Sequence, residues 1–490
     1  MEPKLAMNSE EDALKMDNVL ISEQNDTETT LGPSMSKKQI LKNLIILSSS
    51  FLFLFTAFQS SQNLQSSLNK AEGLGTVTLA TIYAASVLSG LLLPPLVIRH
   101  LGCKWSLVLS MPCYILYMAA NFYPVWGTML PASLLLGVGA APLWAAKCTY
   151  LTQIGTWYAK LTNRDRDDAI NRFFGVFFMM FQTSQIWGNL VSSAVFSLRM
   201  DNTTVDETVI SNCGAKYCPI ENDNNTNLER PDLDKIYTVC GVYLASAVIG
   251  CLTVVFLLDQ IDLDQTKKRD RKPGRHGGDS AHLLWEIVRH WRDSRYQKLL
   301  IPLTVYSGIE QAFFAGDFTK SFVSCTIGIW NVGYVMIAYG VANASCSLLF
   351  GRFVQYVGHV PFFVLALLVH GGTQITLLVW KPDPEMTYIF YILACLWGIG
   401  DAVIQTQINA FYGYLFTNKP EAAFASYRIF ESAGFILSFG YSSFLCTNIK
   451  IYICLGFLAV GMAQYGVVEI THRRSEQHVE TRSMAELCQT

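Results

Sequence analysis

The stretch KKRDRKPGRHGGD, from Lys267 to Asp279, separates two halves of the chain that are built alike. Six apolar stretches precede it and six follow it, each about twenty residues long, which is the length that a helix needs to cross a bilayer at about 1.5 Å per residue. The sequence therefore predicts an all-α polytopic membrane protein with twelve transmembrane helices in two six-helix halves.

Apolar length sets the expected span boundaries and the expected domains. The predicted spans are 41–62, 76–98, 106–126, 128–150, 173–196, 236–258, 299–319, 325–350, 361–380, 387–410, 424–446 and 450–469. The predicted domains are an acidic cytosolic tail without fixed structure (1–40), an N-terminal half (41–258), a basic cytosolic linker (259–298), a C-terminal half (299–470) and a second cytosolic tail (471–490).

Composition excludes several classes of protein. Hydrophobic residues make up 51% of the chain and charged residues 15%, whereas a soluble globular protein carries about a quarter charged residues. The net charge of −2 does not identify a partner, because the charges are concentrated in loops and tails, and we expect no nucleic-acid ligand. No nucleophile with a base, zinc-ligand spacing, phosphate loop or nucleotide fingerprint is visible, so we expect no enzyme, no catalytic residue, no metal and no cofactor.

The second part of the linker, HLLWEIVRHW from His282 to Trp291, has apolar residues at helical spacing with basic residues between them. This pattern predicts an amphipathic helix. It either lies on the cytosolic leaflet of the membrane or packs as a cap on the floor of the helix bundle.

Lysine and arginine placement predicts the orientation. Most of these residues fall in the two tails and the even-numbered loops, so we expect both termini in the cytosol. The long loop 198–235 then faces the exterior or the lumen, where its sequons at Asn202 and Asn224 would be glycosylated. We expect the sequons at Asn25 and Asn343 to be silent, because one is cytosolic and one lies within a span.

The same loop holds Cys213 and Cys218, two of the thirteen cysteines of the chain. Because the loop faces an oxidising compartment, a disulfide between them is the favoured pairing. The alternatives are that both stay free or that nearby Cys240 takes part.

The two halves repeat each other weakly in sequence. PPLVIRHLGCKW (Pro94 to Trp105) aligns with GRFVQYVGHV (Gly351 to Val360), and LLGVGAAPLW (Leu135 to Trp144) aligns with LWGIGDAVIQ (Leu396 to Gln405). This repeat resembles the major facilitator fold, in which two six-helix halves are related by an axis along the membrane normal. The loop signature of that superfamily is degenerate here. Its four residues are Arg99, His100, Gly102 and Lys104, with Arg99 and His100 where an acid and an arginine usually stand.

Polar groups inside spans are costly, so each is a candidate for function. In the facilitator architecture spans one, four, seven and ten line a central cavity, and the candidates on these spans are Gln59, Gln62, Lys147, Glu310, Asp401 and Gln405. One interpretation is a hydrated cavity in which Lys147 neutralises Glu310 or Asp401. The other is a structural ion pair that holds the halves together.

Three further expectations concern other spans. Arg428 and Glu431, three residues apart, predict a local ion pair, and Asp317 is close enough to the outer end of its span to be solvated. The glycine pairs Gly137 with Gly139 and Gly398 with Gly400 predict close helix packing.

Longer runs of sequence resemble a particular family. These runs are FLFLFTAFQSSQNLQSSL (51–68), LGVGAAPLWAAKCTYLT (136–152), FFGVFFMMFQTSQIWGNLVSS (173–193), YSGIEQAFFAGDFTKSFV (306–323), WGIGDAVIQTQINAFYG (397–413) and EAAFASYRIFESAGF (421–435). They are similar to the uncoordinated-ninety-three (Unc-93) family of the major facilitator superfamily, and within it to the homologue A branch. The resemblance extends over about 41–469 and leaves out both tails.

The resemblance implies a partner protein rather than a proven carrier. The founding nematode member is regarded as a regulatory subunit of a two-pore potassium channel, the homologue B branch escorts Toll-like receptors, and homologue A is placed at the plasma membrane. The leading hypothesis is therefore an accessory protein that binds another membrane protein, a potassium channel, and regulates it. The alternatives are a secondary active transporter of an unknown solute and a structural scaffold.

Overall fold

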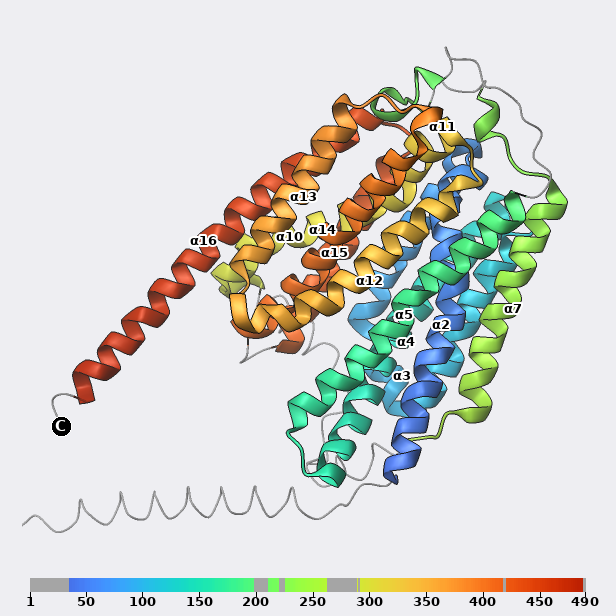
Figure 1. Ribbon diagram of the computed structural model, residues 1–490. Helices are drawn as coiled ribbons and strands as arrows, with labels where there is room; N and C mark the ends of the chain where they lie inside the picture. The colour runs from blue at the N-terminus through green and yellow to red at the C-terminus, as the bar shows by residue number, and fades with distance from the viewer. Residues whose placement is uncertain are drawn as a thin grey trace, which may run out of the picture.

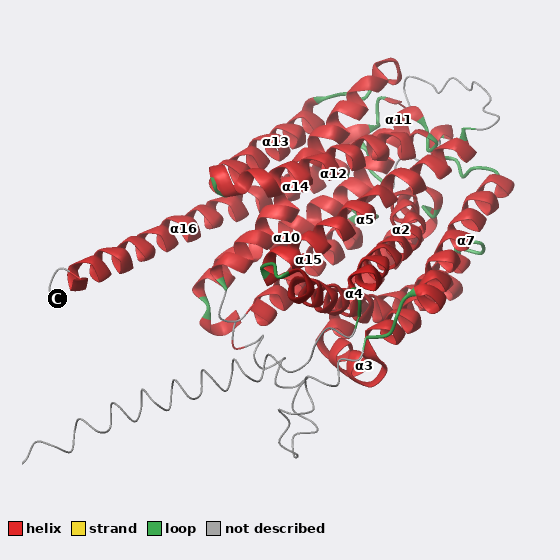
Figure 2. Cartoon of the chain, turned by 60° about the horizontal axis from the view of Figure 1, so that its bottom comes forward, coloured by secondary structure: helices red, strands yellow, loops and turns green. Residues whose placement is uncertain are grey.

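The computed structural model describes residues 35–197, 210–219, 225–261, 289, 291–416 and 420–487. Within these ranges the chain consists of helices and connecting loops, without a β-strand (Figure 2). Four predicted features lie outside the described residues in whole or in large part. They are the N-terminal arm, the basic linker with its expected amphipathic helix, and the sequon residues Asn202 and Asn224.

The N-terminal half contains five long helices, one of which supplies two spans. Ser36 caps the first of them. Its hydroxyl accepts a hydrogen bond from the backbone N–H of Gln39, and the Gln39 side-chain oxygen accepts one from the backbone N–H of Ser36. The helices are α2 (Lys37–Leu68), α3 (Leu74–Ala120), α4 (Trp126–Thr162), α5 (Arg166–Phe196) and α7 (Leu233–Leu257).

The C-terminal half has the same order of spans. Its first span is continuous from α10 through a segment of wider π-type turns, η4, to α11. The helices are α10 (Arg295–Ala312), η4 (Phe313–Ser324), α11 (Cys325–Ile327), α12 (Asn331–Val357), α13 (Val360–Val379), α14 (Thr387–Leu415), α15 (Pro420–Tyr441) and α16 (Thr447–Leu487).

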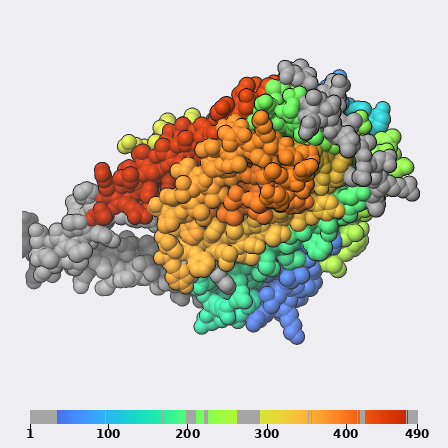
Figure 3. Space-filling model, turned by 45° about the horizontal axis from the view of Figure 1, so that its top comes forward, coloured from blue at the N-terminus to red at the C-terminus, as the bar shows by residue number. Residues whose placement is uncertain are grey.

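The two halves lie side by side as two bundles (Figure 1). Figure 3 shows the same division on the surface, with the orange and red helices of the C-terminal half beside the blue and green helices of the N-terminal half. Helix α5 packs against α12, and α15 packs against α3, so these four helices form much of the contact between the halves.

Ten helical segments of the described chain are long and apolar enough to cross a membrane, which confirms the membrane-spanning character that the sequence predicts. Helices α5, with 31 residues, and α15, with 22, are not among the ten. Both carry polar side chains along their length. Because both pack against the opposite half, they have less surface to present to lipid, which explains their lower hydropathy.

The internal repeat is confirmed at its turns. Gly102, between the second and third spans, has φ +72°, and Gly358, at the matching turn of the other half, has φ +78°. A side chain at such positive φ is strained, so glycine is required at both turns. The break at Gly102 divides α3 into two spans.

The repeat is also confirmed where helices pack. A Cβ on Gly137 would collide with the backbone oxygen of Ile82, and a Cβ on Gly398 would lie 2.6 Å from the backbone oxygen of Tyr339. Gly137 therefore fits α4 against α3 as Gly398 fits α14 against α12. Close helix packing, predicted for these glycines, is what the structure shows.

Several hydrogen bonds join the halves at the end of the bundle opposite the start of α2 and the end of α16. Ser67 and Ser324 share one of 3.0 Å, Thr76 and Ser443 share one of 2.8 Å, and Ser193 donates to the Trp330 oxygen at 2.7 Å. The halves are therefore in direct contact at this end.

Helix α16 continues well past the end of its predicted span. It is one helix of 41 residues, or about 60 Å, and its C-terminal part extends away from the bundle (Figure 1). As far as Leu487, the predicted C-terminal tail is therefore helical.

Candidate functional site

Lys147 of α4 lies among aromatic rings. Its Nζ is 4.6 to 5.3 Å from the ring centroids of four residues, and the side chain is 1% exposed. The four rings belong to Trp144, Phe174, Phe177 and Phe178. Ring faces attract a cation, so this cage replaces part of the hydration that Lys147 loses. Among the described residues no carboxylate pairs with Lys147, so the expected neutralisation of Glu310 or Asp401 by this lysine is wrong.

Glu310 of α10 and Asp401 of α14 instead lie next to each other, inside the C-terminal half. Both are buried. Glu310 Oε2 accepts a hydrogen bond from Trp397 Nε1 at 2.7 Å. Asp401 Oδ2 accepts from the Tyr339 hydroxyl at 2.6 Å and from the Asn343 amide. The pair therefore connects α10, α12 and α14.

The predicted glutamines make hydrogen bonds within their own halves. Gln59 accepts from the Ser184 hydroxyl, and Gln62 accepts from the Tyr83 hydroxyl at 3.4 Å. Gln405 donates to the Ser307 hydroxyl at 2.9 Å. These contacts hold spans one and ten against their neighbours.

Arg428 and Glu431 form the local ion pair that the sequence predicts. Arg428 donates to Glu431 at 2.7 Å, and Glu431 also accepts from the Tyr427 hydroxyl at 2.9 Å. The Glu431 side chain is 6% exposed and the Arg428 side chain 64%. The pair therefore places an accessible cation on α15.

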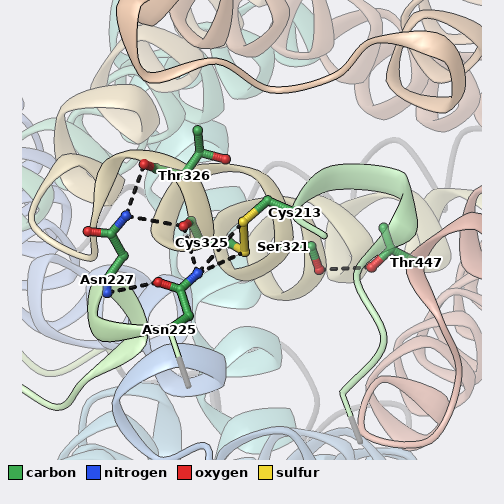
Figure 4. Close-up of a disulfide and its surroundings, with 7 residues drawn as sticks. All are labelled: Cys213, Asn225, Asn227, Ser321, Cys325, Thr326 and Thr447. Carbon is green, nitrogen blue, oxygen red and sulfur yellow. Dashed lines mark hydrogen bonds between the residues drawn. A yellow bond between two sulfur atoms is a disulfide. The ribbon is translucent and has the colours of Figure 1, made fainter. Parts of the chain in front are cut away.

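The predicted disulfide between Cys213 and Cys218 is wrong. Cys213 pairs with Cys325, 112 residues away (Figure 4), and Cys218 pairs with Cys446, 228 residues away. Both bonds fasten the long loop of the N-terminal half to the C-terminal half. Cys240, the alternative partner, is a free buried cysteine.

Hydrogen bonds hold the same loop in place around the first disulfide. Figure 4 shows Asn225 and Asn227 turned toward the end of the seventh span, where Asn225 donates to the Cys325 oxygen at 2.9 Å and Asn227 to the Thr326 oxygen at 3.0 Å. Cys213, Tyr217, Leu228 and Cys325 form a small buried cluster there. The loop is therefore packed on the C-terminal half as well as bonded to it.

Asp317 is not solvated, contrary to expectation. It is 2% exposed and pairs with Lys450 of α16, which is 1% exposed, at 2.7 Å. Ser442 donates a further hydrogen bond to Asp317 at 2.7 Å, and Lys450 donates to the Ser442 backbone oxygen at 2.6 Å. The first and last spans of the C-terminal half are thereby joined by a buried ion pair.

The degenerate facilitator loop lies at the turn around Gly102. Arg99 and His100 are exposed, while Lys104 lies 5.7 Å from the Trp105 ring centroid. Gly102 faces the Gln260 side chain, close to where a Cβ would stand. Among the described residues, no group of three or more His, Cys, Asp or Glu side chains is arranged to hold a metal ion.

Sequence reasoning missed the partners Cys325, Cys446 and Lys450. Cys325 and Lys450 are the first residues of predicted spans and Cys446 is the last of another. All three therefore lie at the same end of the bundle as the long loop. This position could have identified them as candidate partners, since residues at the ends of spans can react or pair with loop residues on their own side of the membrane.

Comparison with known proteins agrees with the resemblance in sequence. Residues 67–464 match the family described as "Ion channel regulatory protein UNC-93". The chain is 47% identical to "Protein unc-93 homolog A" of Xenopus laevis over 447 residues, which is 91% of this chain and 95% of that relative.

Two further likenesses differ in what they show. The chain is 36% identical to the "Putative potassium channel regulatory protein unc-93" of Caenorhabditis elegans over 440 residues, 88% of this chain and 61% of that relative. The solved structure of the nucleoside transporter NupG is 12% identical with a TM-score of 0.58, over 86% of this chain and 98% of that one. This second likeness shows the major facilitator fold alone. By its sequence, the chain belongs to the UNC-93 family.

Proposed function

We propose that this chain is a transporter-like accessory protein of the plasma membrane that binds a potassium channel and regulates its activity or its surface level. The observation that carries the proposal is the 36% identity to the nematode relative, whose name describes a putative potassium channel regulator, over 88% of this chain. That extent includes both halves, so the likeness is not confined to one bundle.

Two features of the chain support a role other than transport. Arg99 and His100 stand at the turn where facilitator transporters usually place an acid and an arginine, so the acid of the usual motif is replaced by a basic residue. Lys147 is enclosed by aromatic rings rather than paired with a carboxylate among the described residues.

The proposal predicts that this chain recovers a potassium channel from native membranes and changes its current. Proximity labelling and co-purification identify the channel, and currents are then recorded with and without the chain. The expected result is a changed current amplitude or changed surface biotinylation of the channel. An unrelated twelve-helix transporter, expressed at the same surface level, is the matched control, because it reproduces any general effect of membrane loading.

Transport is the alternative, favoured by the facilitator fold and by the buried carboxyl groups of Glu310 and Asp401. If purified protein in liposomes moved a solute against its gradient, the accessory role would fail. In that case uptake should stop in Glu310→Gln and Asp401→Asn, and it should persist in Glu385→Gln, which alters an exposed carboxylate near the start of α14.

We also propose that both termini are cytosolic and that Asn202 and Asn224 carry glycans. The two disulfides support this orientation, because bonds at Cys213 and Cys218 form most readily in an oxidising compartment. Glycosidase treatment should reduce the apparent mass of the parent chain and leave an Asn202→Gln, Asn224→Gln double variant unchanged. A parent chain without glycan would contradict the orientation.

A further inference from the structure

Glu310 and Asp401 each leave one carboxyl oxygen without a hydrogen-bond donor. Glu310 Oε2 and Asp401 Oδ2 are bonded, but Glu310 Oε1 and Asp401 Oδ1 are buried and find no partner. The two side chains are 0% and 2% exposed. An unpaired buried acceptor costs about 1–3 kcal/mol, and more when it is charged, so two in adjacent groups indicate a missing donor.

In the part of the chain that the structure describes, no lysine or arginine is bonded to either carboxyl group. Five groups that titrate lie near the pair on the packed helices. None of them is a lysine or an arginine, and Arg428 is bonded to Glu431 rather than to the pair. The five groups are Tyr306 of α10, Tyr339 of α12, His370 of α13, Glu431 of α15 and Cys454 of α16. Among the described residues, no ion pair includes Glu310 or Asp401.

A neutral ring satisfies the hydrogen bonds of His370. Its Nε2 lies 3.2 Å from the Trp397 backbone oxygen and so must carry the proton it donates. Its Nδ1 then accepts from the Tyr306 hydroxyl at 2.7 Å. Tyr306 in turn accepts from the Gln374 amide at 2.9 Å. This chain of bonds needs only one proton on the imidazole, and among the described residues no ion pair joins His370 to Glu310 or Asp401.

Two like charges in contact in this dry interior would repel each other strongly, because the local dielectric is low. A metal cation would remove the repulsion but needs more ligands than the pair offers, since hard cations take about six oxygens. Of the four carboxyl oxygens of the pair, two are free, Glu310 Oε1 and Asp401 Oδ1. A single proton needs only two, one oxygen to carry it and one to accept it.

We propose that Glu310 and Asp401 form a proton-binding site, in which one proton is held between Glu310 Oε1 and Asp401 Oδ1. The shared proton then holds α10 and α14 together. Its loss would leave two carboxylates in contact, and they would repel each other. The site goes beyond the accessory role and does not depend on it, since it belongs to the interior of the C-terminal half, whatever the chain binds.

Infrared spectroscopy of the purified full chain at neutral pH tests the site. A protonated carboxyl group has a carbonyl stretch that a carboxylate lacks. The parent chain should show this band, and the band should shift slowly after transfer to heavy water, because the site is buried. Its absence from the parent would overturn the proposal, and this first measurement needs no variant.

Glu310→Gln and Asp401→Asn should each abolish the band. In each variant the new amide donates to the remaining carboxylate in place of the shared proton, so the fold is kept. Asp259→Asn is the matched control, since Asp259 pairs with Lys42 at 3.2 Å and is 40% exposed. It should leave the band intact. A band that persists at full intensity in either pair variant would come from another group and would overturn the assignment.

Discussion

Lys450→Met should destabilise the protein by about 3–5 kcal/mol, because it leaves the Asp317 carboxylate buried without its cation. Lys450 and Asp317 are 1% and 2% exposed and lie 2.7 Å apart. The lysine also donates to the Ser442 backbone oxygen at 2.6 Å, so a second buried acceptor loses its donor. Thermal unfolding of the detergent-solubilised protein, followed by size-exclusion chromatography, measures the loss.

Lys42→Met is the matched control for this prediction. Lys42 pairs with Asp259 at 3.2 Å, but the two side chains are 48% and 40% exposed, so water screens the pair. Its loss should cost about 0–1 kcal/mol. The Asp317→Asn, Lys450→Met double variant should be more stable than Lys450→Met alone, since no buried charge remains. Equal unfolding temperatures for Lys450→Met and Lys42→Met would show that the buried pair does not stabilise the fold.

The span pattern could be predicted from sequence because hydrocarbon imposes length and apolarity on every helix that crosses it. The exceptions are informative. Helices α5 and α15 lie against the opposite half, so tertiary contact replaces lipid contact for much of their surface and the apolar signal weakens. The turns at Gly102 and Gly358 could also be predicted from the sequence, because few residues other than glycine adopt a positive φ.

Apart from the local pair of Arg428 and Glu431, the partners of the polar residues could not be predicted, because the sequence gives the depth of a residue in a span and not the direction of its side chain. Lys147 and Glu310 both stand on expected cavity spans, yet the lysine faces the rings of its own half and the glutamate faces Asp401. The prediction of the disulfide was wrong for a related reason. Cys213 and Cys218 are near in sequence, but the fold brings each next to a residue more than a hundred positions away.

Gly137→Ala and Gly398→Ala should each destabilise the protein by about 1–3 kcal/mol, because the added methyl group would clash with the backbone of the neighbouring helix, which cannot rotate away as a side chain can. At Gly137 the obstacles are the Ile82 oxygen and the Ala85 Cβ, the latter at 2.6 Å. At Gly398 the obstacle is the Tyr339 oxygen, also at 2.6 Å. Either substitution must push two packed helices apart. Thermal unfolding in detergent again provides the measurement.

Gly241→Ala in α7 is the matched control, since no atom lies within 4 Å of its added Cβ. Without a clash, alanine should leave stability unchanged or raise it by up to about 1 kcal/mol, because it restricts the unfolded chain more than glycine does. Because Gly137 and Gly398 stand in different bundles, their effects should add in the double variant. If all three substitutions changed the stability equally, Gly137 and Gly398 would not be needed for close helix contact. The two halves would then not share this feature of helix packing.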